Sequence, residues 1–248
     1  HAPQGASAHL PLLLLPPFPL DSWAWSGVAE LVGGNVYTLD PPGFGGAADA
    51  EPSLEGYAGA VLAELDARGV DRFVVAGNSM GGYAAMALAE LAPDRIAAIG
   101  LFGTKASADA PDAAAARLEM AARADAGAPA SELVGPMLEK LLGPSAREHR
   151  PELVEALTRR LADAPPAGIA WAQRAMAARP DRTRVLEDLK APGIVVYGVE
   201  DPLMPAAEQR VLASALGTLV ELPCGHLIPL ELPDVAARIV ADLWLMAH

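Results

Sequence analysis

The sequence predicts an α/β fold in which a mostly parallel, doubly wound sheet carries an inserted helical cap. Short apolar runs of strand length alternate with longer segments of helical periodicity, as in sheets covered by helices on both faces. A strand, a sharp turn and a helix follow one another without a gap in residues 72–90. Residues 104–190 contain helical patterns but no convincing strand. We therefore expect residues 1–103 and 191–248 to form the core, and residues 104–190 to form a cap over the strand ends.

The predicted elements follow from hydrophobic periodicity and from the glycines and prolines that interrupt it. Within the inserted block, apolar residues either pack the cap or line an acyl pocket; these are Met137, Leu138, Leu141, Leu142, Trp171 and Met176. The core elements are, in order, a strand at 12–15, a helix at 22–32, a strand at 36–39, a helix at 53–69, a strand from 73 to the glycine at 77, a helix at 80–90, strands at 96–102, 193–197 and 219–222, and a final helix from 233.

Ser79 occupies the apex of the turn between the strand and the helix of residues 72–90. Gly77 and Gly81 leave room two residues on either side of the serine, and Gly82 lets the helix stay close to the sheet. The first amides of the helix and the positive end of its dipole favour an anion at the same place. The segment Gly-Asn-Ser-Met-Gly thus offers a nucleophile and part of an oxyanion site. Taken alone, the pattern also fits a glycine-rich turn with an incidental serine.

This segment resembles the nucleophile elbow of the α/β-hydrolase superfamily, and the resemblance extends over nearly the whole chain. Asp201 stands in G-x-x-D-P-x-x-P and His226 in G-H-x-x-x-x-E-x-P, each directly after a predicted strand. The order Ser79, Asp201, His226 is that of the family's catalytic triad. Because a serine hydroxyl barely ionises at neutral pH, a histidine must take its proton and an acid must orient the ring. The resemblance implies a serine hydrolase similar to esterases and enol-lactonases, without cofactor or metal.

The loop after the first strand departs from the family pattern. Pro16 and Pro17 stand where the family usually carries a His-Gly pair. Since Pro16, Pro17 and Pro19 lack an N–H, Phe18 holds the single backbone donor of this loop. The resemblance therefore implies an oxyanion hole made by the backbone amides of Phe18 and Met80. The Phe18–Pro19 bond is a candidate for the cis form.

Composition restricts the partners. The formal net charge of -13 argues against nucleic acid or an anionic membrane surface. Cys224 is the single cysteine, so the chain forms no internal disulfide and no cysteine cluster for a metal; a small buried thiol is the expected state. The apolar run 10–15 is far shorter than the roughly 20 residues of a membrane span and reads as a strand, not a signal peptide. We expect a cytoplasmic enzyme.

Several polar residues compete with the triad but have weaker contexts. Glu200 adjoins Asp201 and is expected to point away from the histidine. Asp40 lies in a loop that resembles the family's D-x-P-G-x-G scaffold and is expected to be a turn acceptor. Other histidines without a matching context are expected to be solvated; these are His9, His149 and His248.

The expected substrate is a small ester or lactone with a modest, largely apolar acyl part, and a thioester stays open. Cofactor-free perhydrolases share the triad, and carbon–carbon bond hydrolases often share the Gly-Asn-Ser-Met-Gly elbow, so both remain alternatives. A hydrolase-fold binding protein without turnover is an alternative of another class, which the intact serine, acid and histidine disfavour. The serine also disfavours the aspartyl-ester chemistry of dehalogenases and epoxide hydrolases.

Overall fold

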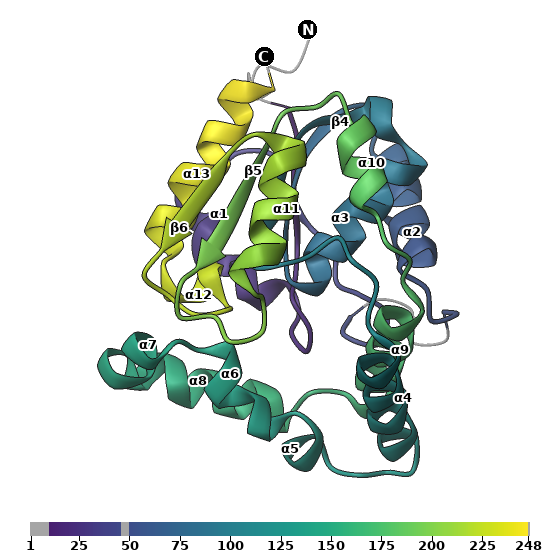
Figure 1. The fold of residues 1–248 in the computed structure, drawn as a ribbon, viewed down its shortest axis with the longest axis vertical. Coiled ribbons are helices and arrows are strands. Elements are labelled where there is room, and N and C mark those ends of the chain that lie inside the picture. Colours follow the sequence, from purple (N-terminus) through teal and green to yellow (C-terminus); the bar gives the residue numbers. More distant parts are fainter. Residues whose placement is uncertain (1–9, 46–49, 248) are drawn as a thin grey trace, which may run out of the picture.

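A parallel sheet lies at the centre of the computed structural model, which describes residues 10–45 and 50–247 (Figure 1). In the described part, the sheet has six strands in the order β2-β1-β3-β4-β5-β6, and each neighbouring pair is parallel. The predicted fold class is confirmed. The strands are β1 (Leu12–Leu15), β2 (Val36–Thr38), β3 (Phe73–Asn78), β4 (Ile96–Phe102), β5 (Gly193–Gly198) and β6 (Leu219–Leu222).

Helices cover both faces of this sheet, which explains why β1, β3 and β4 are buried along their whole length and apolar except for Asn78 at the end of β3. Helices α1 and α13 pack against each other, α13 also packs against β3, β4 and β5, and α2 packs on α3. The core helices are α1 (Ser26–Val32), α2 (Leu54–Ala67), α3 (Met80–Leu91), α10 (Thr183–Asp188), α11 (Ala206–Leu216), α12 (Ile228–Glu231) and α13 (Pro233–Met246).

The predicted helix at 22–32 is divided into a 3-10 turn, Ser22–Trp25, and α1. The Asp21 carboxylate caps the turn by accepting a hydrogen bond from Trp23 N at 3.0 Å. The Trp25 indole donates to Leu15 O at 2.8 Å and anchors the turn to the end of β1. The tighter turn thus has a tertiary cause that hydrophobic spacing does not reveal.

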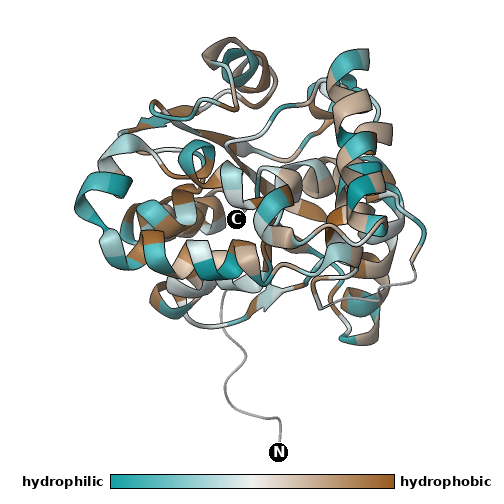
Figure 2. Cartoon of the chain, turned by 90° about the horizontal axis from the view of Figure 1, so that it is seen from below, coloured by the Kyte–Doolittle hydropathy of each residue, from teal (hydrophilic) through white to brown (hydrophobic). Residues whose placement is uncertain are grey.

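Residues 104–190 hold helices and, where the structure describes them, no strand. Helices α4 and α9 pack along each other below the sheet in Figure 1, and α5 to α8 continue beside them. In Figure 2, hydrophilic and hydrophobic residues alternate along the helices, as expected where one helix face is buried. We refer to the following as the cap helices: α4 (Pro111–Asp125), α5 (Ala130–Leu133), α6 (Leu138–Leu141), α7 (Pro144–His149), α8 (Pro151–Ala162) and α9 (Pro166–Ala178).

Helix α10 lies within the expected insertion but packs against α3 and α11 of the core. Buried Arg182, directly before α10, donates to Glu90 of α3 at 2.9 Å and also pairs with Glu55 of α2. This packing favours a cap that ends before α10. The domain boundary at residue 190 stays a prediction.

Candidate active site

Ser79 lies between β3 and α3 in a backbone conformation that residues other than glycine rarely adopt, with φ of 53° and ψ of -114°. Its N–H donates to Phe102 O at 2.9 Å, and its carbonyl accepts from the Thr104 hydroxyl at 2.8 Å. Both contacts come from the end of β4 and the residues that follow it. The neighbouring strand thus holds the strained turn in place.

The glycines around Ser79 have a steric reason. A Cβ atom on Gly77 would lie 2.1 Å from the carbonyl oxygen of Gly81, and one on Gly81 would lie 2.0 Å from that of Leu15. A Cβ on Gly82 would lie 2.6 Å from side-chain atoms of Thr104. At these three positions, α3 lies too close to β1, β3 and the segment after β4 to leave room for a side chain, as the sequence pattern predicts.

His226 and Asp201 form a buried pair. Nδ1 of His226 lies 2.7 Å from Oδ2 of Asp201. The other carboxylate oxygen of Asp201 accepts backbone hydrogen bonds from Leu203 N at 2.7 Å and Met204 N at 3.3 Å. The loop after β5 thus fixes the carboxylate, and the carboxylate fixes the imidazole ring with its other nitrogen free of this pair.

Ser79 and His226 line one pocket of about 140 Å³. Its walls come from the turn after β3, the loops after β1, β4, β5 and β6, and cap helices α4 and α9. The structure thus gathers side chains from the carboxyl ends of several parallel strands, where open α/β sheets bind ligands. The other lining residues are Phe18, Tyr83, Lys105, Asp109, Arg117, Met176, Leu203 and Met204.

Phe18 and Met80 lie where backbone donors could face this pocket. Phe18 lines it, and the Phe18–Pro19 peptide bond is cis, the form that the sequence made a candidate. Met80 is the first residue of α3, and the first amides of a helix have no acceptor within the helix itself. Their role as an oxyanion hole stays a prediction.

Comparison with known protein families identifies the family of this chain. The model of the alpha/beta hydrolase family matches residues 12–239, which includes all six strands and the residues above. The chain belongs to the alpha/beta hydrolase family.

Relatives of this hydrolase include esterases and a lactonase. It is 29% identical over 247 residues to a pimeloyl-[acyl-carrier protein] methyl ester esterase of Aromatoleum aromaticum, covering 94% of this chain and 97% of the relative. A solved thermophilic esterase from Thermogutta terrifontis, with malate bound, is 31% identical with a TM-score of 0.91, covering 96% of this chain and 90% of that one. The enol-lactonase from Burkholderia xenovorans LB400 is 25% identical with a TM-score of 0.84, covering 95% and 92%.

The competing carboxylates of this hydrolase have structural partners. Glu200 accepts hydrogen bonds from the backbone and hydroxyl of Ser145 at the start of α7. Asp40 accepts from Ser22 N at 2.7 Å, and burial raises the pKa of Asp40. Glu200 thus points away from the histidine, as expected. Asp40 is an acceptor, but its donor is Ser22, 18 positions earlier, and not a group of its own turn.

His149 and Cys224 also lie outside the pocket lining. His149 is exposed on α7, with Nδ1 2.9 Å from Ser145 O, whereas His9 and His248 lie outside the described residues. Burial raises the pKa of the Cys224 thiol, and nearby carboxylates add to this effect, so the thiol is a buried, unreactive group.

Two residues that support the histidine escaped the sequence analysis. The Asn78 amide nitrogen donates to Phe102 O at 2.9 Å and to His226 O at 3.1 Å. The Glu231 carboxylate accepts from Gly225 N at 2.8 Å, directly before the histidine. Asn78 belongs to the elbow and Glu231 to the histidine motif, so their positions were visible, but their partners were not.

The pocket is also more polar than the sequence led us to expect. Met176 lines it, as the set of cap candidates allows, and so do Lys105, Asp109 and Arg117. These charged residues lie in the region where the family resemblance is weakest, and no motif singles them out.

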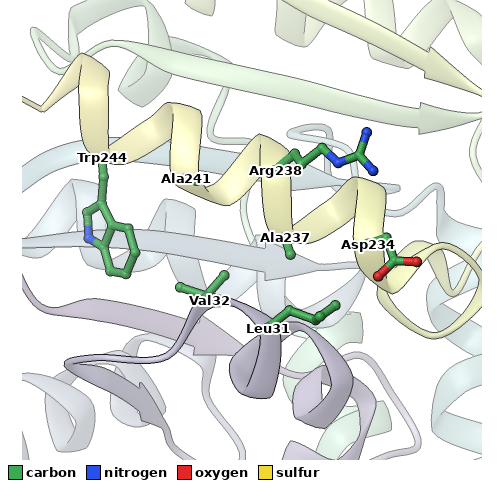
Figure 3. A pocket seen from close by; sticks show the side chains of 7 residues that line it. All are labelled: Leu31, Val32, Asp234, Ala237, Arg238, Ala241 and Trp244. Atoms are coloured by element: carbon green, nitrogen blue, oxygen red, sulfur yellow. The ribbon is translucent and has the colours of Figure 1, made fainter.

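Larger pockets of this hydrolase lie elsewhere. The pocket in Figure 3 has a volume of about 330 Å³ and lies between α1 and α13, where Leu31 and Val32 face Ala237 and Trp244. Another, of about 320 Å³, lies beside α2. Neither contains Ser79 or His226 in its lining, so chemistry, and not size, identifies the candidate site.

Within residues 10–45 and 50–247, no group of three or more histidine, cysteine, aspartate or glutamate side chains is arranged to hold a metal ion. Over the same residues, the helices are too short or too polar to cross a membrane.

Proposed function

We propose that this chain is a serine hydrolase that cleaves a carboxylic ester or lactone through an acyl-serine intermediate. Ser79 is the nucleophile, His226 the general base and Asp201 the residue that orients the ring. The observation that carries this proposal is the 2.7 Å contact between His226 Nδ1 and Asp201, beside a serine held in a strained turn of the same pocket.

In the proposed first step, Ser79 Oγ attacks the substrate carbonyl while Nε2 of His226 takes its proton. Asp201 keeps the proton on Nδ1 and stabilises the imidazolium that forms. The protonated ring then gives its proton to the leaving alcohol, or to the ring-opened oxygen of a lactone. In the second step, water attacks the acyl-serine with His226 again as base, which releases the acid and restores Ser79.

The negative charge on the tetrahedral intermediate needs donors at the carbonyl oxygen. We assign this role to the backbone amides of Phe18 and Met80. Removing one such donor typically costs about 3 to 4 kcal/mol of transition-state stabilisation. The dipole of α3 adds a favourable field, since its positive end points toward Ser79.

The substrate class is proposed from the relatives and from pocket size. Esterases and an enol-lactonase are among the similar proteins, so an ester or lactone is the proposed bond. A pocket of about 140 Å³ favours a short acyl group.

A cytoplasmic location fits the lone buried cysteine, because reduced thiols are usual in that compartment.

The test is hydrolysis of short p-nitrophenyl esters by the native chain and by Ser79→Ala. We expect the variant to lose about 10³-fold or more in kcat, since no hydroxyl remains to form the acyl-enzyme. A fluorophosphonate probe should label the native protein at Ser79. Ser214→Ala is the matched control, because Ser214 is exposed on α11 and bonds to Arg210 of the same helix.

Equal turnover by Ser79→Ala and the native chain, with both folded, would exclude Ser79 as the nucleophile. A native chain that binds esters but releases no acid would instead favour the non-catalytic binding protein.

A further inference from the structure

We propose that the pocket beside Ser79 binds a carboxylate of the substrate, so that the preferred ester carries a second, acidic group at the far end of a short acyl chain. Lys105, Arg117 and the Tyr83 hydroxyl would hold this group. The proposal rests on the proposed function for the position of the ester bond, but the anion site itself stands on separate observations.

Positive charge exceeds negative charge on the wall of this pocket. Among the described side chains, Asp109 meets three cations: Arg117 Nε at 2.6 Å, Arg179 Nη2 at 2.8 Å and Lys105 Nζ at 3.4 Å. Burial by itself raises the pKa of Asp109, but the hydrogen bonds from Arg179 and Arg117 hold it far below its ordinary value. One carboxylate thus offsets one of three cations.

Glu208 is a second acid near this group and accepts a hydrogen bond from Ser107 at 3.1 Å. Even with Glu208 counted, the group keeps an excess of positive charge, in a chain whose formal net charge is -13. Such local excess is typical of a site that receives an anion.

Lys105 and Arg117 differ from Arg179 in their surroundings. The Arg179 side chain is 2% exposed and donates to the backbone oxygens of Met176 and Ser107, so it ties the end of α9 to the loop before α4. The side chains of Lys105 and Arg117 are 21% and 24% exposed and line the pocket. The buried Arg179 alone would be enough to neutralise Asp109 and join the two segments. The partly exposed Lys105 and Arg117 are therefore free to serve a ligand.

Tyr83 supplies an independent observation. Its hydroxyl is buried and has no hydrogen-bond partner among the described residues, although Tyr83 lines the same pocket. Burial raises the pKa of this phenol, so it keeps its proton and acts as a donor. Because buried polar groups are nearly always hydrogen-bonded in folded proteins, a donor in this state points to a missing acceptor.

Tyr83 also lies between the cationic cluster around Asp109 and the serine at the start of α3. The Arg179 guanidinium stacks on it, with 4.1 Å from Cζ to the ring centroid. Ser79 and Tyr83 both line this pocket, and Tyr83 N donates to Ser79 O at 3.2 Å. An ester at Ser79 and a carboxylate at Tyr83, Lys105 and Arg117 therefore share a space of about 140 Å³, which suits a short dicarboxylic monoester.

The first test compares monomethyl glutarate with dimethyl glutarate, which have the same acyl chain with its far carboxylate free or masked. Acid release in a pH-stat gives kcat/KM for each. We expect the native chain to prefer the monoester, and Arg117→Met or Lys105→Met to lower the monoester-to-diester ratio by about tenfold, since a charged hydrogen bond is lost. Arg123→Met is the matched control, because Arg123 is exposed on the same helix as Arg117 and should leave the ratio unchanged.

The second test does not depend on turnover. Calorimetric titration of Ser79→Ala with glutarate should show binding at one site, weakened about tenfold by Arg117→Met and severalfold by Tyr83→Phe, which removes only the hydroxyl. A native preference for the diester, or glutarate binding that these variants leave unchanged, would overturn the carboxylate site. Loss of diester hydrolysis in Ser79→Ala would still uphold the proposed function. Glutarate binding by a chain that hydrolyses neither ester would uphold the site and defeat that function.

Discussion

The turn that presents Ser79 to the pocket can form because Gly77 and Gly81, two positions away on either side, carry no side chain. A Cβ added at Gly77 or Gly81 would meet backbone oxygens, which cannot rotate away as the end of a side chain can. The turn therefore needs glycine at these two positions for space, while Ser79 itself tolerates a strained backbone.

We predict that Gly81→Ala destabilises the protein by about 2 to 3 kcal/mol, because the added methyl group must displace the backbone of β1 or α3. Ester hydrolysis should fall with it, since the displaced helix carries Ser79 and Met80. Urea unfolding measures the first effect and p-nitrophenyl ester turnover the second. Gly59→Ala in α2 is the matched control, because a Cβ there meets no atom within 4 Å and alanine favours the helix. Equal stability of the two variants would show that the close approach is not required.

Among the elements, the four-residue helix α12 holds the segment that carries His226 in place. Its last residue, Glu231, accepts hydrogen bonds from Gly225 N, next to the histidine, and from Gly143 N of the cap at 3.2 Å. The backbone of Leu227 also donates to Leu141 O at 3.1 Å. The segment that carries His226 is thus held between the core and the cap helices.

Burial raises the pKa of Glu231 in the folded protein, although its backbone donors oppose this shift. Because the folded pKa lies above the unfolded value of about 4.3, the folded state is favoured while the carboxyl is protonated and loses this advantage as pH rises. We predict that Glu231→Gln, which keeps an acceptor oxygen, gains stability relative to the native chain as pH rises above about 4.3. Chemical unfolding at a series of pH values measures this difference.

Glu221→Gln is the control for that series, since Glu221 is exposed on β6. It measures the effect of a Glu-to-Gln change at an exposed position. If the unfolding free energy of Glu231→Gln ran parallel to that of the native chain at all pH values, the raised pKa of Glu231 would be wrong.

For the whole molecule, 31 acidic and 18 basic side chains leave an excess of negative charges that repel one another. Clusters such as Arg182 with Glu55 and Glu90, or Asp109 with its cations, place basic groups where they join helices. Apart from the buried Asp201 and Glu231, many of the remaining acids are exposed, and their mutual repulsion favours the unfolded chain.

We predict that adding sodium chloride raises the melting temperature between about 0.01 M and 0.15 M salt, a range over which the screening length falls from about 30 Å to about 8 Å. Screening weakens long-range repulsion more than buried pairs such as Asp109 with Arg179, so the net effect is stabilising. Thermal unfolding followed by circular dichroism is the measurement. A melting temperature that falls with salt would mean that attractive surface pairs dominate.

Local sequence patterns predicted the six strands, the core helices at 22–32, 53–69, 80–90 and from 233, and the order of Ser79, Asp201 and His226 along the chain. These features follow from periodicity and from glycines and prolines that act over a few residues, so they can be read from a linear chain. The expectation of an apolar acyl pocket came from local patterns in the cap as well. Such patterns indicate which helix face is buried but not which side chains line the pocket.

Which distant groups meet became visible in the folded structure alone. Asn78 bonds to a residue 148 positions away, and Glu231 joins the histidine segment to the cap across 88 positions. Arg179 reaches Asp109 across 70 positions because α4 and α9 pack side by side. Such contacts depend on the mutual placement of packed elements, which hydrophobic periodicity does not encode, and they give the pocket its charge.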